Sequence, residues 1–304
     1  MTGTSENQRQ TEDTFGYKWK RRSTYESPAM QAEWRRWLLE KYFDGDEDGP
    51  RALLGAGPTR ILDAGCGSGG SALALFGDLL RHHRYTGIDI SEAADVCKQR
   101  FGERGIPGEF VRCSLDAIPA NFGDFDMVFS EGVLHHTDSV ERAISSLSAR
   151  LRPGGLFLFY VYVKKAPIRE FTDDLIREAI AGMDNDEAWD ALMPLTELGR
   201  KLGELDVEIE IEKPIPFLGI PAGKVNLQRL FYYKVCKAYY RSDYTDDEMN
   251  HINFDWFRPK NCFRHTPEEV RDFCASAGLE IERFRVEESG ITVIGRKSRR
   301  APMA

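Results

Sequence analysis

Short apolar runs alternate with helical periodicities along much of this 304-residue chain. Apolar runs in the manner of buried parallel strands start at Arg60 and at Phe125 and span residues 85–90 and 155–163. The segments between them, 71–82, 91–104 and 138–152, have the spacing of helices that pack on one face, the last of them with Asp138 as its cap. Strands that alternate with helices predict an α/β fold, here a Rossmann-like doubly wound sheet with helices on both faces.

The pattern is interrupted over residues 166–265 and then resumes. Within the interruption, residues 168–181 and 226–240 have helical periodicity and residues 207–211 alternate like a strand. Thr266-Pro267-Glu268-Glu269 then predicts a helix start with proline in its first turn. The sequence therefore predicts one α/β core that carries a long insertion.

The first predicted strand runs directly into a glycine-rich turn, Arg60-Ile61-Leu62-Asp63-Ala64-Gly65-Cys66-Gly67-Ser68-Gly69-Gly70. Its glycines also fit the dinucleotide pattern G-x-G-x-x-G, so on their own they leave a nicotinamide cofactor open. The acid Asp63 would repel a pyrophosphate, whereas it would attract a ligand with an ammonium and a sulfonium. S-adenosylmethionine is such a ligand.

Residues 63–69 resemble the first motif of the class I S-adenosylmethionine-dependent methyltransferases, in the small-molecule branch of that superfamily. The resemblance continues in order through residues 85–91, where Asp89 lies roughly 20 residues after the glycine loop. It extends to residues 125–136 and to the turn at 151–157. It implies a mostly parallel sheet closed by an antiparallel strand, here from residues 280–286 and 290–296.

The resemblance also implies which residues would hold S-adenosylmethionine. Asp89 would accept hydrogen bonds from both ribose hydroxyls, and Ile90 would pack beneath the adenine. Where the family usually has an acid for the adenine amino group, this chain has Ser114, whose hydroxyl is the expected substitute. The predicted cofactor-binding set follows the ends of four strands: Asp63, Gly65, Cys66, Gly67, Gly69, Asp89, Ile90, Ser114, Leu115, Ser130 and Glu131.

The same resemblance also implies roles for two parts of the chain outside the core. Similar methyltransferases use an aromatic N-terminal segment as a lid that excludes water, and an insertion at this point as a cap over the acceptor pocket. For Phe15, Tyr17 and Trp19, lid contact and plain core packing both stay open. The chain is thus expected to have four parts: an N-terminal tail and aromatic lid helix (1–48), the first part of the S-adenosylmethionine-binding core (49–165), an inserted substrate cap (166–265) and the completion of the core (266–304).

Methyl transfer is an in-line displacement at the sulfonium carbon, so it depends first on alignment. A hydroxyl or ammonium acceptor must also lose a proton, and His135, His136 and Tyr17 are the candidate catalytic residues for that step. A structural role for the histidine pair stays open as well. The predicted acceptor contacts are aromatic rings, which bind cations or flat molecules, and an arginine that could clamp a carboxylate: Trp19, Tyr160, Tyr233 and Arg258.

Composition narrows the class of protein further. The formal net charge of −8 argues against a broad phosphate-binding surface, so no nucleic-acid partner is expected. The six cysteines lack metal-binding or redox spacing, which predicts free thiols in a reducing cytosol and no metal site. No apolar run approaches the ~20 residues that span a bilayer, so we expect a cytoplasmic protein without a membrane partner.

Three functions are compatible with these features. The first is methyl transfer from S-adenosylmethionine to an oxygen, nitrogen or carbon atom of a small molecule. The second keeps the cofactor but displaces its own aminobutyrate chain by cyclisation, which releases methylthioadenosine. The third is a noncatalytic subunit that binds the cofactor and assists a partner.

Overall fold

The computed structural model describes residues 5–118 and 122–299. The first residues of the predicted tail and the last residues of the predicted core completion therefore lie outside it. The described chain divides into two compact units. The first comes from Met1–Lys20, Gln31–Val163 and Phe263–Ala304, and the second from Arg21–Met30 and Lys164–Cys262.

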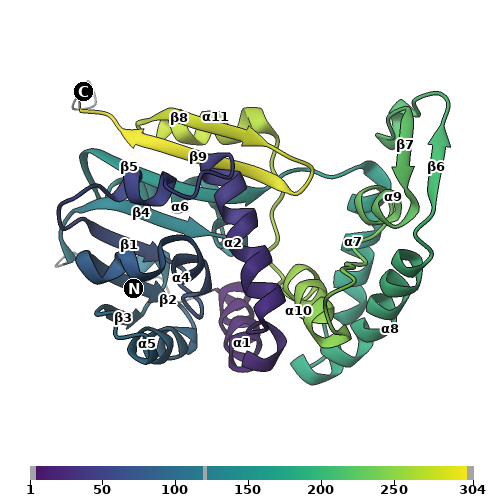
Figure 1. Ribbon diagram of the computed structural model, residues 1–304, viewed down its shortest axis with the longest axis horizontal. Coiled ribbons are helices and arrows are strands. Elements are labelled where there is room, and N and C mark those ends of the chain that lie inside the picture. The colour runs from purple at the N-terminus through teal and green to yellow at the C-terminus, as the bar shows by residue number, and fades with distance from the viewer. Residues whose placement is uncertain (1–4, 119–121, 300–304) are drawn as a thin grey trace. The chain divides into compact units, whose positions relative to one another are not determined.

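The first unit is built on a seven-stranded sheet (Figure 1). In spatial order its strands are β3 (Glu109–Arg112), β2 (Arg84–Asp89), β1 (Arg60–Ala64), β4 (Phe125–Glu131), β5 (Leu151–Tyr162), β9 (Gly290–Lys297) and β8 (Leu279–Val286). Strands β1 to β5 pair in parallel, and β9 runs antiparallel to both of its neighbours. The predicted sheet, mostly parallel with an antiparallel closing strand, is confirmed.

Alternate side chains along each strand enter separate cores on the two faces of this sheet. In β1, Leu62 and Ala64 pack with helices α6 (Val140–Ser148) and α11 (Pro267–Ser276). Ile61 packs on the other face, against α2 (Pro28–Phe43), α3 (Gly49–Leu54), α4 (Gly70–Phe76) and α5 (Ala93–Glu103). Helices thus cover both faces, as the doubly wound prediction requires (Figure 1).

Helix ends agree with the sequence signals at some positions and differ at others. Thr266 caps α11 with a capping box, as predicted. At α6 the prediction of Asp138 as cap is wrong, because the hydroxyl of Ser139 accepts the amide hydrogen of Arg142 instead. The helix predicted over 71–82 ends at Phe76, where Gly77 has a φ of +50°, and continues as a 3₁₀ helix over Gly77–His82.

The second unit is mainly helical. Its elements are α7 (Pro167–Ile180), α8 (Asn185–Glu204), α9 (Leu227–Lys234), α10 (Asp246–Phe257) and the hairpin of β6 (Glu208–Ile211) and β7 (Gly223–Asn226). The periodicity located α7 and β6 and placed the start of α9 correctly, but it missed α8 and α10. Both missed helices begin with a capping box, at Asp184 and at Thr245.

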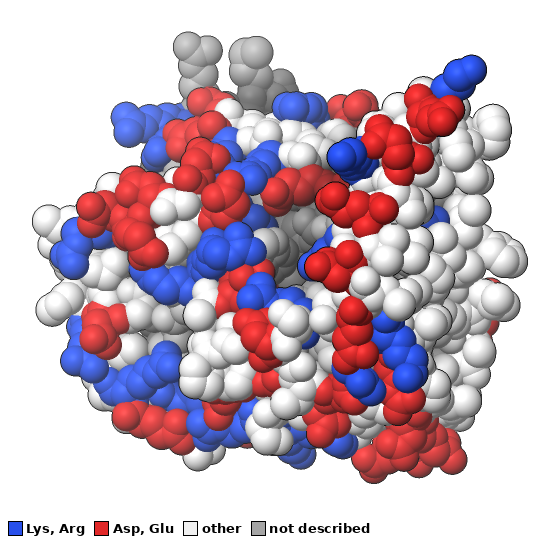
Figure 2. Space-filling model, turned by 45° about the vertical axis from the view of Figure 1, so that its right-hand side comes forward, with Lys and Arg blue, Asp and Glu red and all other residues white. Residues whose placement is uncertain are grey.

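Across the described ranges, no helix combines the length and apolar character that crossing a membrane requires. On the face of the molecule in Figure 2, acidic and basic side chains are interspersed instead of forming one basic field.

The packing around α4 can be tested by substitution of Gly70, the first residue of this helix. A Cβ at this position would overlap the Trp34 ring of α2, whereas a Cβ at Gly102 in α5 would enter open space. We predict that Gly70→Ala lowers the free energy of unfolding by roughly 1–3 kcal/mol, because the ring must shift. The control Gly102→Ala should raise it by roughly 0.5–1 kcal/mol through helix propensity. Urea unfolding measures both; equal effects of the two substitutions would contradict this packing.

Candidate active site

The candidate site lies in the first unit, at the carboxyl ends of β2, β1 and β4. Strands β1 and β4 are neighbours, and the connections that leave them lead to opposite sides of the sheet. Open α/β sheets bind ligands at such a switch point. The glycine loop follows β1, Asp89 ends β2 and Glu131 ends β4, so the fold brings these three predicted segments to one edge.

The glycine loop requires glycine for conformation and for space. Gly65 and Gly67 have φ values of +81° and +50°, a region that side chains disfavour. A Cβ on Gly65 would overlap the side chain of Val133, and one on Gly67 would lie 2.9 Å from Nε1 of Trp19. The loop backbone is therefore closely approached from the β4 side by Val133 and from the N-terminal helix by Trp19.

Asp89 organises this loop from the end of β2. Its Oδ2 accepts the amide hydrogen of Gly67 at 2.9 Å, and its Oδ1 accepts the amide and the hydroxyl of Ser91 at 2.8 and 2.6 Å. Burial raises the pKa of this carboxyl, and the hydrogen bonds from Ser91 and Gly67 oppose the shift. The predicted ribose acceptor is thus fixed beside the loop; its role toward ribose stays a prediction.

Asp63 is buried one residue before the end of β1. Its Oδ2 accepts a hydrogen bond of 2.6 Å from the hydroxyl of Tyr85 in β2. Burial raises the pKa of Asp63 to about 7; the Tyr85 bond opposes that shift, while the charges of Asp89 and Glu131 add to it. Tyr85 is a site residue that sequence reasoning missed, because nothing in its strand marked its hydroxyl as a partner of Asp63.

Glu131 forms a buried ion pair with Lys41 of α2, and its Oε2 accepts a hydrogen bond of 2.6 Å from the Tyr42 hydroxyl. The Lys41 ammonium also lies 3.4 Å from the ring centroid of Trp37 and 3.8 Å from that of Tyr160. Burial lowers the pKa of Lys41 to about 8, against the attraction of Glu131. Predicted as an acceptor contact, Tyr160 here belongs to an aromatic cage around Lys41, a residue that the sequence did not single out.

His135 and His136 follow β4 in a short 3₁₀ helix and are buried. The His135 ring stacks on Tyr162, with ring centroids 3.6 Å apart, and packs edge-on to His136 at 4.3 Å. On the other side, the His136 ring lies 5.0 Å from that of Phe15. The pair is embedded in an aromatic cluster that immobilises both rings, and its catalytic role stays a prediction.

The N-terminal helix α1 (Glu6–Lys20) packs on this region with a polar buried face. The buried positions of the helix are Gln8, Thr11, Thr14, Gly16 and Lys18. Gln8 donates a hydrogen bond of 2.8 Å to the carbonyl of His136, and the Trp19 ring lies parallel to that of Trp34, with centroids 6.2 Å apart. A helix that only closes a core would bury apolar side chains, so the polar face supports the lid interpretation of Trp19. Tyr17 is half-buried on the same helix.

The other residues predicted to bind the cofactor make different contacts within the protein. The Ser130 hydroxyl donates to the carbonyl of Ala64 at 2.8 Å and joins β4 to β1. A hydrogen bond with Cys97, together with burial, raises the pKa of the Cys66 thiol. Ile90 and Ser114 are half-buried after β2 and β3. Gly69, with a φ of +73°, is the residue before α4.

The two predicted acceptor contacts of the insertion belong to the second unit. Arg258 is buried; its Nε donates to Asn185 Oδ1 at 2.9 Å and its Nη2 to the carbonyl of Met183 at 2.8 Å. Tyr233 packs edge-on to Tyr232, with ring centroids 4.8 Å apart. These contacts give Arg258 a structural role within the unit, and its clamp of a carboxylate stays a prediction.

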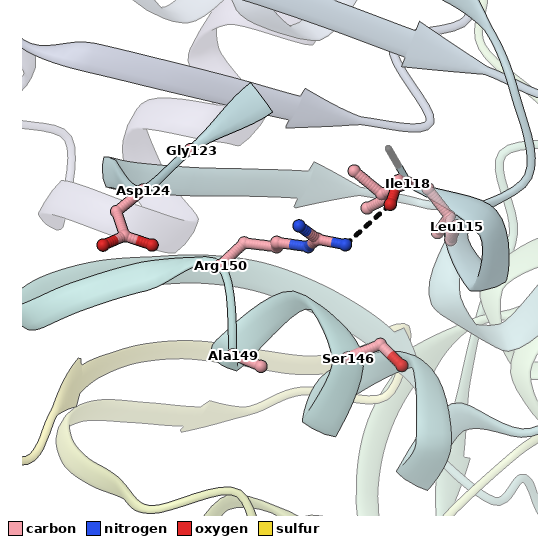
Figure 3. Close-up of a pocket in the computed structure, with 7 residues that line it drawn as sticks. All are labelled: Leu115, Ile118, Gly123, Asp124, Ser146, Ala149 and Arg150. Atoms are coloured by element: carbon pink, nitrogen blue, oxygen red, sulfur yellow. Dashed lines mark hydrogen bonds between the residues drawn. The ribbon is translucent and has the colours of Figure 1, made fainter. Parts of the chain in front are cut away.

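A separate cavity of about 430 Å³ lies beside α6 (Figure 3). It is lined by Leu115, Ile118, Gly123, Asp124, Ser146, Ala149 and Arg150. The Arg150 side chain extends toward Ile118 and donates to its carbonyl at 2.6 Å. Of the predicted cofactor residues it contains Leu115 alone, so this cavity is distinct from the glycine-loop site.

Within residues 5–118 and 122–299, no three His, Cys, Asp or Glu side chains are grouped to hold a metal ion. The six cysteines are free thiols, in agreement with their scattered spacing.

Residues 62–159 match the family model described as a methyltransferase domain. The matched segment begins in β1 and ends in β5, so it contains the glycine loop, Asp89, Glu131 and the histidine pair. The insertion lies outside it.

Curated relatives are also similar to parts of the chain. A malonyl-[acyl-carrier protein] O-methyltransferase of Enterobacter lignolyticus is 33% identical over 103 residues, which cover 33% of this chain and 38% of that protein. A phthiotriol/phenolphthiotriol dimycocerosates methyltransferase of Mycobacterium tuberculosis is 28% identical over 160 residues, 52% of this chain and 51% of the relative. The chain spans about a third to a half of the length of the curated relatives it matches.

The fold has a counterpart in magnesium protoporphyrin IX methyltransferase from Synechocystis PCC 6803, solved with bound S-adenosylmethionine. The TM-score is 0.51 at 13% identity, over 98% of this chain and 100% of that one, a likeness of fold alone. The match to the methyltransferase domain, the strand order of the sheet and the position of the glycine loop after β1 are all consistent with this one fold. Residues 62–159 are thus similar to the methyltransferase-domain family, and the chain shares its fold with this methyltransferase of known structure.

Proposed function

We propose that this protein transfers a methyl group from S-adenosylmethionine to a small-molecule acceptor. The observation that carries the proposal is the convergence of three carboxylates, Asp63, Asp89 and Glu131, at the ends of three adjacent strands. Asp89 and Glu131 are close enough to raise the pKa of Asp63 by repulsion. Such a group of like charges favours a cationic ligand.

The charges of the site also discriminate between adenosine ligands. Lys41 neutralises Glu131, which leaves the carboxylates of Asp63 and Asp89 without a cationic side chain bonded to them in the described chain. A sulfonium and an ammonium would supply the missing positive charge, whereas a pyrophosphate would add negative charge. S-adenosylmethionine therefore fits these residues better than a nicotinamide dinucleotide does.

The residues of the loop would hold the nucleoside, and the lid would keep water away. When bound, S-adenosylmethionine supplies a methyl group on a positively charged sulfur. Asp89 would accept hydrogen bonds from the ribose, and Gly65 and Gly67 would let the loop backbone approach the ligand. Trp19 packs against this loop, as a residue that excludes water would.

A small acceptor agrees with the charge of the molecule. The net charge is −8 and the face in Figure 2 has no single basic field, whereas nucleic-acid binding rests on clustered Lys and Arg. By their names, relatives act on malonyl-[acyl-carrier protein], on phthiotriol/phenolphthiotriol dimycocerosates and on tRNA U34, so the proposal of a small acceptor rests on the charge of this chain and not on the relatives. A protic acceptor would lose its proton to His135 or His136, which adjoin the end of β4.

The products of S-adenosylmethionine turnover test the proposal. The protein is incubated with S-adenosylmethionine, first alone and then with a metabolite extract, and the nucleoside products are identified by mass spectrometry. We expect S-adenosylhomocysteine that appears only with the extract, together with a methylated compound. Methylthioadenosine without the extract would indicate cyclisation instead, and cofactor binding without either product would indicate a noncatalytic subunit.

Asp89→Asn should weaken the binding of S-adenosylmethionine. The substitution removes a charged hydrogen-bond acceptor, so a loss on the order of 1–3 kcal/mol is expected, which is about 5- to 150-fold in Kd. Isothermal titration calorimetry measures the change, with the exposed Asp95→Asn of α5 as control. Unchanged affinity in Asp89→Asn would refute the ribose assignment.

Asp63→Asn should stabilise the protein at high pH. The pKa of Asp63 is raised from 3.8 to about 7 in the folded state. The folded protein therefore holds a proton that the unfolded chain releases, and stability falls as pH rises through this window. The penalty is complete above pH 7 and amounts to about 4 kcal/mol at most. Urea unfolding at pH 4 and pH 8 should show a gain for Asp63→Asn at pH 8 only; no gain at pH 8 would show that Asp63 is ionised without cost.

A further inference from the structure

Helix α7 of the second unit buries charged side chains and exposes apolar ones (Figure 1). On its inner face, Arg169 Nε lies 2.6 Å from Asp173 Oδ2, and the two side chains are 2% and 1% exposed. On its outer face, Ile168, Phe171 and Leu175 follow one another at helical spacing and are 37%, 68% and 53% exposed. A surface helix ordinarily has the opposite arrangement. We refer to these three apolar residues as the α7 stripe.

Polar contacts on the inner side fix which face of α7 turns outward. Asp173 Oδ2 also accepts a hydrogen bond of 2.8 Å from Nε1 of Trp256 in α10. Arg169 donates to the carbonyl of Tyr232 in α9. A rotation of the helix that buried the stripe would break these bonds and expose the ion pair. The outward position of the stripe is therefore built into the packing of the unit.

A further aromatic ring is exposed near the amino end of α7. The turn that joins β6 to β7 contains the short helix Pro216–Leu218, in which Phe217 is 78% exposed. This turn contacts α7, and a Cβ on Gly219 would lie 3.6 Å from Cβ of Ala166, the residue before the helix. Most of the large apolar side chains that are exposed in the described chain belong to this unit. Exposed apolar groups that adjoin one another mark a site of association.

The residues along the stripe indicate what covers it. Lys164, exposed just before α7, and Glu178, exposed in its last turn, lie at equal distances in sequence on either side of Phe171. Ile168 and Leu175 flank the same ring more closely. In an antiparallel pair of α7 helices centred on Phe171, the lysine of each copy would approach the glutamate of the other, and the apolar residues would oppose one another. The stripe and its flanking charges are thus complementary to themselves.

We propose that the α7 stripe is the contact face of a symmetric dimer, in which α7 packs antiparallel against α7 of a second copy of this chain. A two-fold axis presents the same patch on both sides, so one self-complementary stripe is enough for a closed pair. Association would remove the side chains of Phe171 and Leu175 from water, which the hydrophobic effect favours. A parallel pair would instead bring like charges together at both ends of the helix.

An anionic bilayer fits this face less well than a second copy does. Asp174 and Glu178 are exposed on α7, and the formal net charge of the chain is −8, so negatively charged headgroups would repel the protein. Surfaces that bind membranes combine their apolar residues with Lys and Arg instead. A second copy supplies both apolar surface and opposite charge.

The oligomeric state of the full chain tests the proposal without cofactor or acceptor, so the outcome is independent of the proposed function. Sedimentation velocity is measured at protein concentrations from about 1 to 100 μM. We expect the wild type to form a species of twice the monomer mass, and Phe171→Glu to associate at least tenfold more weakly. The control Val286→Glu places the same charge at an exposed apolar residue of β8 in the first unit and should associate like the wild type.

Thermal unfolding separates the loss of the interface from a loss of the fold. Because the Phe171 ring is exposed in the single chain, Phe171→Glu should unfold at the wild-type midpoint when the protein is dilute. The midpoint of the wild type should rise with protein concentration, and that of Phe171→Glu should not. A lower midpoint of Phe171→Glu at every concentration would show that the ring belongs to the packing of the monomer, and would overturn the proposal.

Charge reversal tests the antiparallel arrangement. Lys164→Glu and Glu178→Lys should each weaken association, and the double variant should restore it to within about threefold of the wild type. If Phe171→Glu abolishes the dimer but the double variant stays weak, the contact face stands and its antiparallel arrangement is wrong.

Two results would overturn the dimer itself: a wild type that stays monomeric at the highest concentration, or a dimer that Phe171→Glu leaves intact. A monomeric wild type that sediments with phosphatidylglycerol vesicles, when Phe171→Glu does not, would identify a bilayer as the occupant of the stripe.

Discussion

The burial of three carboxylates at neighbouring strand ends is the constraint on which the rest of the candidate site depends. Asp63, Asp89 and Glu131 lie at or next to the carboxyl ends of three neighbouring strands, and burying like charges together is costly. The protein offsets this cost locally: Tyr85 donates to Asp63, Ser91 and Gly67 donate to Asp89, and Lys41 and Tyr42 bind Glu131. The remaining negative charge is what a cationic cofactor would neutralise.

The need to offset the charge of these buried carboxylates explains several features of the structure that otherwise have no common cause. α2 carries a fully buried lysine because Glu131 needs a counter-charge, and the aromatic rings of Trp37 and Tyr160 enclose that lysine. The glycine loop is held by Asp89, so its conformation depends on the same carboxylate that is expected to bind ribose. α1 buries polar side chains beside this region, which suits a ligand-covering helix better than a core helix.

Much of this architecture could be predicted because its signals are local. The apolar runs located β1, β2, β4 and β5, and the acid before the glycine loop predicts a cationic ligand. Thr266, followed by Pro267, announced α11 in the same way. A strand, a cap or a motif depends on residues that are adjacent in the sequence, so a single sequence contains it.

What the sequence did not reveal depends on residues that meet only in the fold. Lys41 pairs with Glu131 across 90 positions, and Tyr85 reaches Asp63 from a neighbouring strand. The hydroxyl of Ser130 joins two strands, a use that its position in the fourth motif did not suggest. The missed helices α8 and α10 did carry capping boxes in the sequence. α10 buries a face of mixed polarity that includes Glu248, Asn250 and Asn253, and α8 contains Pro194, a residue that usually interrupts a helix.

The central claim is that a positively charged ligand is bound beside Asp63, and proton release tests it most directly. At pH 7 a carboxyl with a pKa of about 7 is half protonated, and a nearby cation stabilises its ionised form. Calorimetric titration with S-adenosylmethionine in two buffers of different ionisation heat should therefore show release of up to about half a proton per site. S-adenosylhomocysteine, which lacks the sulfonium charge, should release less, and Asp63→Asn should abolish the release. Proton uptake, or equal release in wild type and Asp63→Asn, would contradict the claim.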